Sequence, residues 1–191
     1  EKYRVVPEIR ESYRKELGVE NKRVFLHVGR LHPAKNHRFL LELFAAWVKE
    51  NPDDVLLIVG EGGLRDEIEH IISELGIMKA VIMLGARNDV HKLMQAADCF
   101  LFPSLWEGLP VTVVEAQAAG LPCLVSANVT DDVFISPLTV KLPIDQGIEC
   151  WINKMRELNY ARMDVTADIQ KAGFDVQVLA RQMQEFYEGI K

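Results

Sequence analysis

The sequence predicts a doubly wound α/β domain, in which helices cover both faces of one parallel sheet. Three observations support this class. Short apolar runs of strand length recur along the 191-residue chain, and most of them end at Gly or Pro. Segments with apolar residues at helical spacing separate these runs. The two patterns alternate, and alternating strands and helices form parallel sheets because each helix carries the chain back across the sheet. We therefore expect a single Rossmann-like domain.

Five strands are expected, each made almost entirely of large apolar residues, as in strands buried on both faces. Their ranges are 23–29, 55–59, 80–84, 99–102 and 122–125. Helices are expected before and between them, at 8–17, 36–49, 64–75, 90–97 and 111–119. The helix over 36–49 illustrates the pattern, because one of its faces carries Phe39, Leu40, Leu43, Phe44 and Trp47.

Beyond residue 126 the pattern weakens. The range 127–143 is expected to be mostly loop with one short strand, and 144–158 and 176–190 to be helices. No linker interrupts the chain, so residues 1–191 are expected to form one domain. The sequence begins without Met, and its first residues look like the middle of a longer chain, so we expect a piece of a larger protein.

The composition is that of a soluble globular protein, with 49% hydrophobic and 26% charged residues. The net charge of −6 argues against nucleic-acid binding, which requires a basic face to neutralise phosphates. No apolar run is long enough for a transmembrane helix, and no signal peptide is recognisable. Cys99, Cys123 and Cys150 are widely spaced in apolar surroundings, so we expect reduced, buried thiols and a cytoplasmic protein.

The loop after the first strand carries residues suited to an anion, and ligands of doubly wound sheets bind at such strand ends. Gly29 permits a tight turn, Arg30 and Lys35 flank it, and Asn36 suits the N-cap of the next helix. Two cations above a helix N-terminus favour a phosphate group. The alternative is a solvated loop with two ordinary surface charges.

The loop after the fourth strand leads into two acids. Glu107 precedes a turn that contains Gly108, and Pro110 suits the first turn of the next helix, whose amides would face an anion. Glu115 lies too far into that helix to be an N-cap, and a carboxylate among Val and Ala requires a partner or a ligand. A carboxylate can accept the vicinal hydroxyls of a sugar. Alternatively, Glu115 pairs with a core Arg or caps a neighbouring backbone.

Six motifs in this order resemble glycosyltransferase family 4, the glycosyl transferases group 1, which are retaining enzymes of the GT-B fold. The motifs are Gly29-Arg30 with Lys35-Asn36, 59–62, Leu84-Gly85, Ala97-Asp98, Pro103-Ser104, and 107–110 through Glu115-Ala116. Two glutamates separated by seven residues are the signature of the family. The details are similar to bacterial enzymes that build capsular or exopolysaccharide chains.

The resemblance implies a role for each matching residue. Arg30 and Lys35 match the basic pair that binds the donor diphosphate and stabilises the leaving nucleotide, and Glu107 matches the acid that holds the transferred sugar. These three are the candidate catalytic residues. Glu115 matches the acid that binds the ribose hydroxyls. The other donor-binding candidates line the same cleft or, for Arg87, belong to the loop that holds the base: Gly29, Gly62, Arg87, Gly108, Leu109 and Pro110.

The resemblance also implies an activity. The expected reaction is hexosyl transfer with retention from a nucleotide-diphosphate sugar, here a UDP-sugar, to a glycan or lipid-linked acceptor. Enzymes of this fold need no metal or other cofactor, and the sequence contains no Asp-x-Asp motif. The chain matches the C-terminal, donor-binding half, so an N-terminal acceptor domain would be its partner and the chain alone would not transfer sugar. We also expect peripheral association of the full enzyme with the cytosolic face of a membrane.

One alternative has the same fold but no enzymatic activity: a nucleotide or nucleotide-sugar binding module without sugar transfer. A Rossmann oxidoreductase fits less well, because no Gly-x-Gly-x-x-Gly follows the first strand. Other polar residues have structural interpretations. His27 is expected in the core, Asp98 as a structural hydrogen-bond acceptor, and His32 and His37 at the surface.

Overall fold

The computed structural model describes residues 2–3 and 6–189 and contains one sheet of six parallel strands. The order across the sheet is β3-β2-β1-β4-β5-β6. The strands are β1 (Val24–Val28), β2 (Val55–Val59), β3 (Val81–Gly85), β4 (Cys99–Phe102), β5 (Cys123–Ser126) and β6 (Thr139–Leu142). The five strands expected from apolar runs are confirmed, and the doubly wound fold with them. The sixth is the short strand expected within the loop 127–143.

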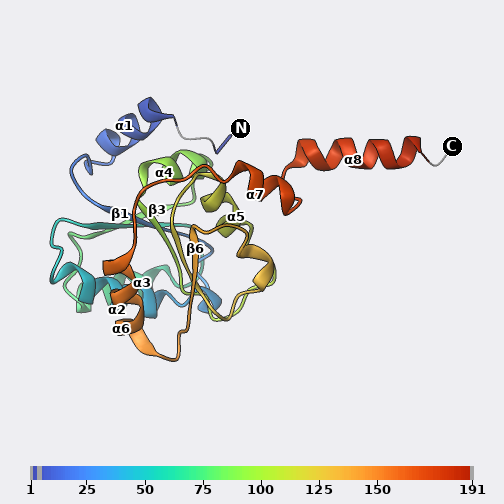
Figure 1. Ribbon diagram of the computed structural model, residues 1–191. Coiled ribbons are helices and arrows are strands. Elements are labelled where there is room, and N and C mark those ends of the chain that lie inside the picture. The colour runs from blue at the N-terminus through green and yellow to red at the C-terminus, as the bar shows by residue number, and fades with distance from the viewer. Residues whose placement is uncertain (1, 4–5, 190–191) are drawn as a thin grey trace.

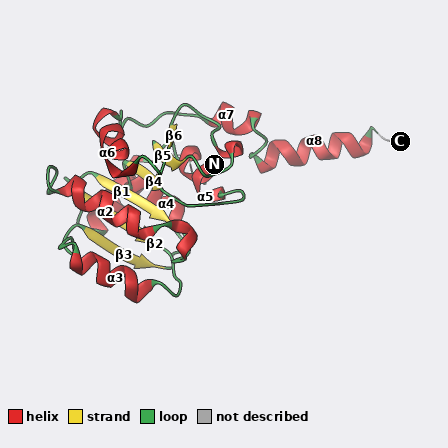
Figure 2. Ribbon diagram, turned by 90° about the horizontal axis from the view of Figure 1, so that it is seen from below, coloured by secondary structure: helices red, strands yellow, loops and turns green. Residues whose placement is uncertain are grey.

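Helices cover both faces of the sheet (Figures 1 and 2). One layer contains α1 (Pro7–Glu16), α4 (Val90–Ala96), α5 (Val111–Ala118) and α7 (Thr166–Lys171), and the other contains α2 (His37–Val48), α3 (Arg65–Glu74) and α6 (Gly147–Glu157). Two short 3-10 helices, η1 (Pro33–Lys35) and η2 (Asp131–Val133), lie in loops. Helix α7 was not expected, because its six residues bury only Ile169 and show no helical period.

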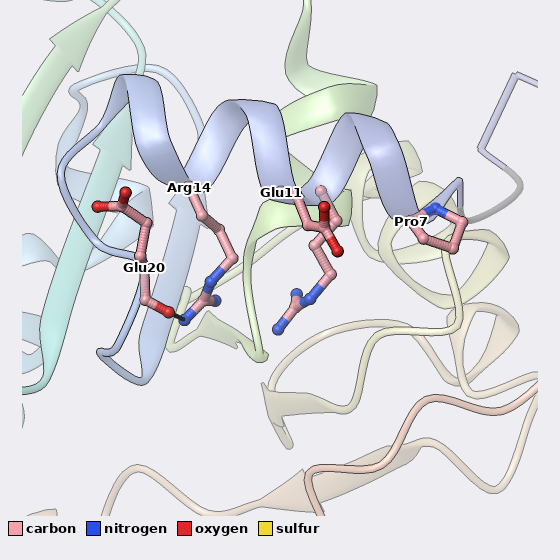
Figure 3. A pocket seen from close by; sticks show the side chains of 5 residues that line it. Pro7, Glu11, Arg14 and Glu20 are labelled. Atoms are coloured by element: carbon pink, nitrogen blue, oxygen red, sulfur yellow. Dashed lines mark hydrogen bonds between the residues drawn. The ribbon is translucent and has the colours of Figure 1, made fainter.

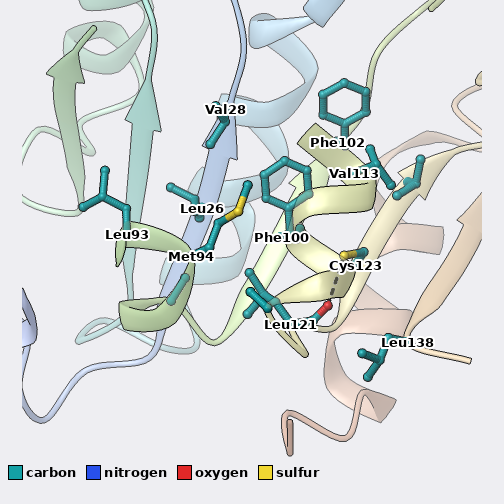
Figure 4. Close-up of a cluster of buried hydrophobic side chains, with 14 of the residues drawn as sticks. Leu26, Val28, Leu93, Met94, Phe100, Phe102, Val113, Leu121, Cys123 and Leu138 are labelled. Atoms are coloured by element: carbon teal, nitrogen blue, oxygen red, sulfur yellow. Dashed lines mark hydrogen bonds between the residues drawn. The ribbon is translucent and has the colours of Figure 1, made fainter. Parts of the chain in front are cut away.

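Alternate side chains of the strands enter two apolar cores, one on each face of the sheet. On the face covered by α4 and α5, the core contains Leu26, Phe100 and Phe102 (Figure 4). On the opposite face, Phe25 packs edge-on against Trp47 of α2, with ring centroids 5.8 Å apart. Burial on both faces explains why the strands are continuous apolar runs. Each large side chain buried in this way contributes about 1.5–3 kcal/mol.

Three arginines satisfy the carbonyl groups at the C-terminal end of α4, which have no partner within the helix. Arg10 and Arg14 of α1 and Arg162, which precedes α7, all donate to these backbone oxygens. Arg10 and Arg14 also pair with Asp98, at 2.6 and 3.1 Å. The same carboxylate accepts the Val24 amide at 2.8 Å. Asp98 therefore has the structural role expected for it, and it joins α1 to the start of β1.

The three cysteines carry free thiols. Cys99 and Cys123 are buried as expected, and burial raises the pKa of both thiols. Cys150 differs from the expectation, because it lies on α6 and is only half-buried.

Helix α8 (Val176–Glu188) extends away from the body of the domain (Figures 1 and 2). Its large apolar side chains are exposed: Val176, Leu179, Met183, Phe186 and Tyr187. The helix expected over 176–190 is confirmed through residue 188, and its last position lies outside the described residues. Within the described ranges, no helix is both long and apolar enough to cross a membrane.

We expect Arg162→Ala to lower the free energy of unfolding by about 2–4 kcal/mol, because its loss removes the side-chain donor of the Ala119 and Met94 carbonyl groups and one of the two donors at Gln95. Arg162 donates to the carbonyl oxygens of Ala119, Met94 and Gln95 at 2.6, 2.8 and 2.7 Å. Arg156→Ala is the control. Arg156 pairs with Glu50 at 2.7 Å on the exposed surface, and its loss should cost less than about 1 kcal/mol. Chemical denaturation measures both values, and equal losses would contradict the capping role.

Candidate functional site

Two loops that lie far apart in the chain meet at the carboxyl edge of the sheet, because the strand order reverses there. β1 lies between β2 and β4, so the chain builds one half of the sheet from β1 and then returns to its other side. Such reversals open a crevice beyond the strand ends, where ligands bind. Here the loop after β1 contacts the loop after β4, and the Leu105 amide donates to the Ala34 carbonyl at 2.7 Å.

An ion pair joins these two loops. Lys35 Nζ lies 2.5 Å from Glu107 Oε1, and the two side chains are 15% and 16% exposed. The ammonium also lies 4.7 Å from the centre of the Phe102 ring, within the range of a cation–π interaction. The structure therefore brings together one expected basic residue and one expected acid. The pair presents a cation for an anionic ligand and, beside it, an acceptor for a hydroxyl.

Gly29 allows Lys35 to lie in this position. A Cβ on Gly29 would stand 2.8 Å from Lys35 Cε and 3.0 Å from Cδ, so the lysine stem lies directly against the glycine. A larger residue would push the stem away from Glu107. Gly29 does not have a positive φ. The chain does bend at Gly29, as expected after the strand, and contact with the Lys35 stem is a further reason for glycine there.

The loop after β2 packs against the backbone of the loop after β1. The Leu31 amide donates to the Glu61 carbonyl at 2.9 Å. Gly60 has a φ of 144°, and a Cβ there would overlap the Gly29 carbonyl. A Cβ on Gly62 would overlap the Leu31 carbonyl in the same way. Backbone packing thus requires glycine at Gly62, which the sequence had suggested as part of a ligand cleft.

The starts of two helices differ from their expected form. Asn36 occupies the N-cap position of α2 with a left-handed φ of 55°, but its side chain forms no cap hydrogen bond. Pro110 precedes α5 as its N-cap and does not lie in the first turn. Gly108 and Leu109 are exposed ahead of it, and a Cβ on Gly108 would meet nothing within 4 Å. The entry to α5 is therefore open to solvent.

Glu115 forms no hydrogen bond or ion pair with Lys35 or Arg30 in the described part of the chain. Its carboxylate accepts a hydrogen bond from the Tyr3 hydroxyl, 112 residues away. Among the described residues, neither a core Arg nor a backbone amide pairs with Glu115, and its partner there is a phenol. The Tyr3 ring also packs edge-on against His91 of α4, with centroids 6.3 Å apart. No local sequence signal connects Tyr3 with Glu115, so sequence reasoning missed it.

Arg87 is held by carboxylates. Its Nε and Nη2 donate to both oxygens of Asp89, at 2.8 and 2.6 Å, and Nη2 lies 3.8 Å from Glu16 of α1. Tyr13 donates to Asp89 as well, at 2.8 Å. The Arg87 guanidinium, with help from Tyr13, lowers the pKa of Asp89 to about 2. Arg30, in contrast, is exposed and forms no hydrogen bond or ion pair with any described residue.

Three buried polar side chains lie next to these loops in the chain. His27, His37 and Ser104 each have an atom without a hydrogen-bond partner among the described residues. His27 and His37 have ring centroids 5.1 Å apart, and His27 Nδ1 lies 2.9 Å from the Leu101 carbonyl. Burial lowers the pKa of His27 to about 3 and of His37 to about 4, and the Lys35 charge lowers both. The core position expected for His27 is confirmed, whereas the surface position expected for His37 is wrong.

A hollow beside α1 is a separate feature. It is lined by Pro7, Arg10, Glu11, Arg14 and Glu20 (Figure 3). Its two arginines are those that pair with Asp98 and donate to the end of α4, so their charges are already engaged. None of the residues expected to bind a ligand lines this hollow.

Residues 9–140 match the family described as Glycosyl transferases group 1. The matched range includes both loops of the Lys35–Glu107 pair and all of α5 with Glu115. The chain belongs to the glycosyl transferases group 1 family. The fold agrees, because one doubly wound sheet of this kind forms each half of a GT-B glycosyltransferase.

Relatives within the family are longer than this chain. EpsF of Bacillus subtilis, named as a glycosyltransferase, is 36% identical over 156 residues, which cover 79% of this chain and 41% of EpsF. An Escherichia coli protein named UDP-Gal:α-D-GlcNAc-diphosphoundecaprenol α-1,3-galactosyltransferase is 43% identical over 110 residues, which cover 56% of this chain and 28% of that protein. The chain therefore spans less than half the length of these two relatives.

A solved structure of HepE from Anabaena in complex with UDP shows the same fold. It superposes on this chain with a TM-score of 0.80 at 25% identity, covering 98% of this chain and 54% of HepE. This chain is thus similar to about half of a protein that binds UDP.

We expect Gly60→Ala to lower the free energy of unfolding by at least about 2 kcal/mol, because its Cβ would overlap the Gly29 carbonyl at a φ that suits glycine. Gly63→Ala is the matched control in the same loop. A Cβ there would meet nothing within 4 Å, so the change should stay within about 0.5 kcal/mol. Chemical denaturation compares the two. A well-tolerated Gly60→Ala would show that the loops are not held this closely.

Stability should decline as the pH falls from about 6.5 towards 4. His27 and His37 have an ordinary pKa of 6.5 when unfolded and about 3 and 4 in the fold. The unfolded chain therefore binds protons that the folded chain does not, and stability that is complete above pH 6.5 is lost as the pH falls. Each histidine accounts for roughly 2 kcal/mol between about pH 6.5 and 5.

Denaturation of His37→Asn at several pH values measures this effect. The variant should lose part of the pH dependence, whereas His70→Asn, at an exposed position, should keep it. A wild-type slope in His37→Asn would contradict the assignment.

Proposed function

We propose that the chain binds a nucleotide-diphosphate sugar, with a UDP-sugar as donor, and forms the donor half of an enzyme that transfers a hexosyl group with retention. The observation that carries the proposal is the Lys35–Glu107 pair at the reversal point of the sheet. Membership of the family and the likeness to HepE, which was solved with UDP, support it.

Lys35 and Arg30 would stabilise the leaving group. Transfer breaks the bond between the anomeric carbon and the phosphate oxygen, so negative charge develops on the departing nucleoside diphosphate. A cation already fixed in a water-poor site stabilises this charge without reorganising. Lys35 is largely buried and held by Glu107, whereas Arg30 is exposed and available to close over phosphate. Two cations here would do the work of a metal ion, so the proposal includes transfer without a metal or other cofactor.

Glu107 would hold the transferred sugar. When phosphate engages Lys35, the neighbouring carboxylate can accept hydroxyls of the hexose that is bonded to that phosphate. The backbone at Gly108, Leu109 and Pro110 would contact sugar and phosphate, because the entry to α5 is open and helix N-termini favour anions.

The nucleoside would lie farther along α5. We assign the ribose hydroxyls to Glu115, a half-buried acceptor on that helix. The loop of Arg87 would hold the base, mainly through backbone groups, because Asp89 already engages the Arg87 guanidinium.

A second domain would bind the acceptor. The chain spans less than half the length of the curated relatives it matches, and the exposed apolar side chains of α8 offer a surface for another folded part to cover. The acceptor would be a glycan or a lipid-linked sugar, as in bacterial capsule or exopolysaccharide synthesis. The name of the Escherichia coli relative supports this class. The enzyme would act in the cytoplasm at the membrane face, and this chain alone would not transfer sugar.

Isothermal titration of the chain with UDP, in buffer containing EDTA, tests the donor site. We expect saturable binding without metal. Lys35→Met should weaken it about 10- to 100-fold, because a charge-assisted hydrogen bond contributes about 1.5–3 kcal/mol. Lys141→Met is the matched control, since Lys141 also pairs with a carboxylate, Asp131, but lies on the edge strand β6. It should bind UDP like the wild type.

Three outcomes would change the proposal. Failure to bind UDP, GDP or ADP would contradict a nucleotide site. Unaltered UDP binding by Lys35→Met would place the nucleotide elsewhere. Binding by this chain, with no transfer by the longer protein that contains it, would favour a non-catalytic nucleotide-sugar binding module.

A further inference from the structure

Glu115 depends on a residue that is distant in the chain. It is half-buried on α5, and its neighbours Val114 and Ala116 are buried and offer no side-chain donor. Among the described residues, the Tyr3 hydroxyl is the group that donates a hydrogen bond to its carboxylate. A glutamate without a fixed partner distributes among several side-chain conformations. The contact with Tyr3 therefore decides where the carboxylate oxygens lie.

Tyr3 is itself held in place. Its ring is half-buried, packs against the apolar core on the α4 and α5 face of the sheet, and lies edge-on to His91. Burial and the hydrogen bond to Glu115 raise the pKa of the phenol well above its usual value. The hydroxyl thus stays protonated through the neutral range, so Tyr3 donates and Glu115 accepts.

We infer that Tyr3 is a positioning residue of the nucleotide site, which acts on the ribose through Glu115. The inference rests on the proposed function, because it adds a residue to the ribose-binding part of that site. The hydrogen bond engages Oε1 and leaves Oε2 and a further lone pair of Oε1 to accept ribose hydroxyls. A carboxylate oriented before binding loses less conformational freedom when the nucleotide arrives.

Two other roles for Tyr3 give different results. If its hydroxyl occupied the place of a ribose hydroxyl, its removal would strengthen nucleotide binding. If Tyr3 only stabilised the fold, its removal would weaken the binding of every nucleotide equally. The packed ring favours positioning, because a ring that had to leave would expose apolar surface of the core.

The test is isothermal titration of Tyr3→Phe, which removes the hydroxyl and keeps the ring, with UDP and with 2′,3′-dideoxy-UDP. We expect the affinity for UDP to fall about three- to tenfold, because only UDP contacts the oriented carboxylate through its ribose hydroxyls. The affinity for the dideoxy analogue should change less than about twofold. Tyr160→Phe is the matched control. Its hydroxyl donates to the Met155 carbonyl at 2.7 Å, and its loss should leave both affinities unchanged.

Glu115→Gln completes the comparison. In that background, Tyr3→Phe should have little further effect on UDP binding, because the two side chains act as one unit. Tighter UDP binding by Tyr3→Phe, or an equal fall for both nucleotides, would overturn the inference. A wild-type chain that binds no nucleotide would overturn the proposed function instead. If the wild type prefers UDP to the analogue and Tyr3→Phe shows the same preference, the role of Tyr3 alone is refuted.

Discussion

The parallel pairing of β1 with β4 is the constraint on which the candidate site depends. The register sets Phe25 opposite Cys99 and Leu26 opposite Phe100, so the two strands end together at one edge of the sheet. Only for this reason do Lys35 and Glu107, which follow different strands, stand within one hydrogen-bond length. Apolar burial on both faces of the sheet maintains the pairing, so the energy that forms the core also assembles the site.

Close backbone packing then fixes the position of the lysine. Gly60 and Gly62 let the loop after β2 touch the loop after β1, and Gly29 lets the Lys35 stem lie flat against the chain. The electrostatic surroundings match this geometry. Burial keeps His27 and His37 neutral, so the ammonium faces one carboxylate and no competing positive charge from the adjacent rings. A cation held in this way needs little rearrangement to meet an anion.

The two ends of the short helix α4 have different roles. Contacts at its C-terminal end stabilise the fold, and contacts near its start involve residues of the candidate site. Its C-terminal carbonyls are satisfied by arginines from two segments that are distant in sequence, which ties the first helix and the chain before α7 to the domain. Near its start, His91 packs against Tyr3, and Asp89 holds Arg87. The same helix thus connects the stable core with the groups assigned to the nucleoside.

By itself, the sequence determined the fold class and the positions of the loops that carry the candidate site residues. The strands over 55–59 and 99–102 agree with β2 and β4 residue for residue, because a strand buried on both faces is an uninterrupted apolar run between turn residues. The order of motifs identified the family as well, since most of the motifs lie at a strand end or in the loop that follows it. Helix α7 was not predicted, because its six residues are too few to show the helical spacing of apolar side chains.

Only the tertiary structure decided which side chains meet. It paired Lys35 with Glu107, gave Glu115 a phenol as partner, and turned Arg87 towards Asp89. It also buried His37, whose position beside a charged loop had suggested the surface. Arg87 and Asp89 are only two residues apart, but the pairs Lys35–Glu107 and Tyr3–Glu115 join distant segments and depend on which strands lie side by side. Strand order arises from the packing of the whole chain, so no local pattern of residues records it.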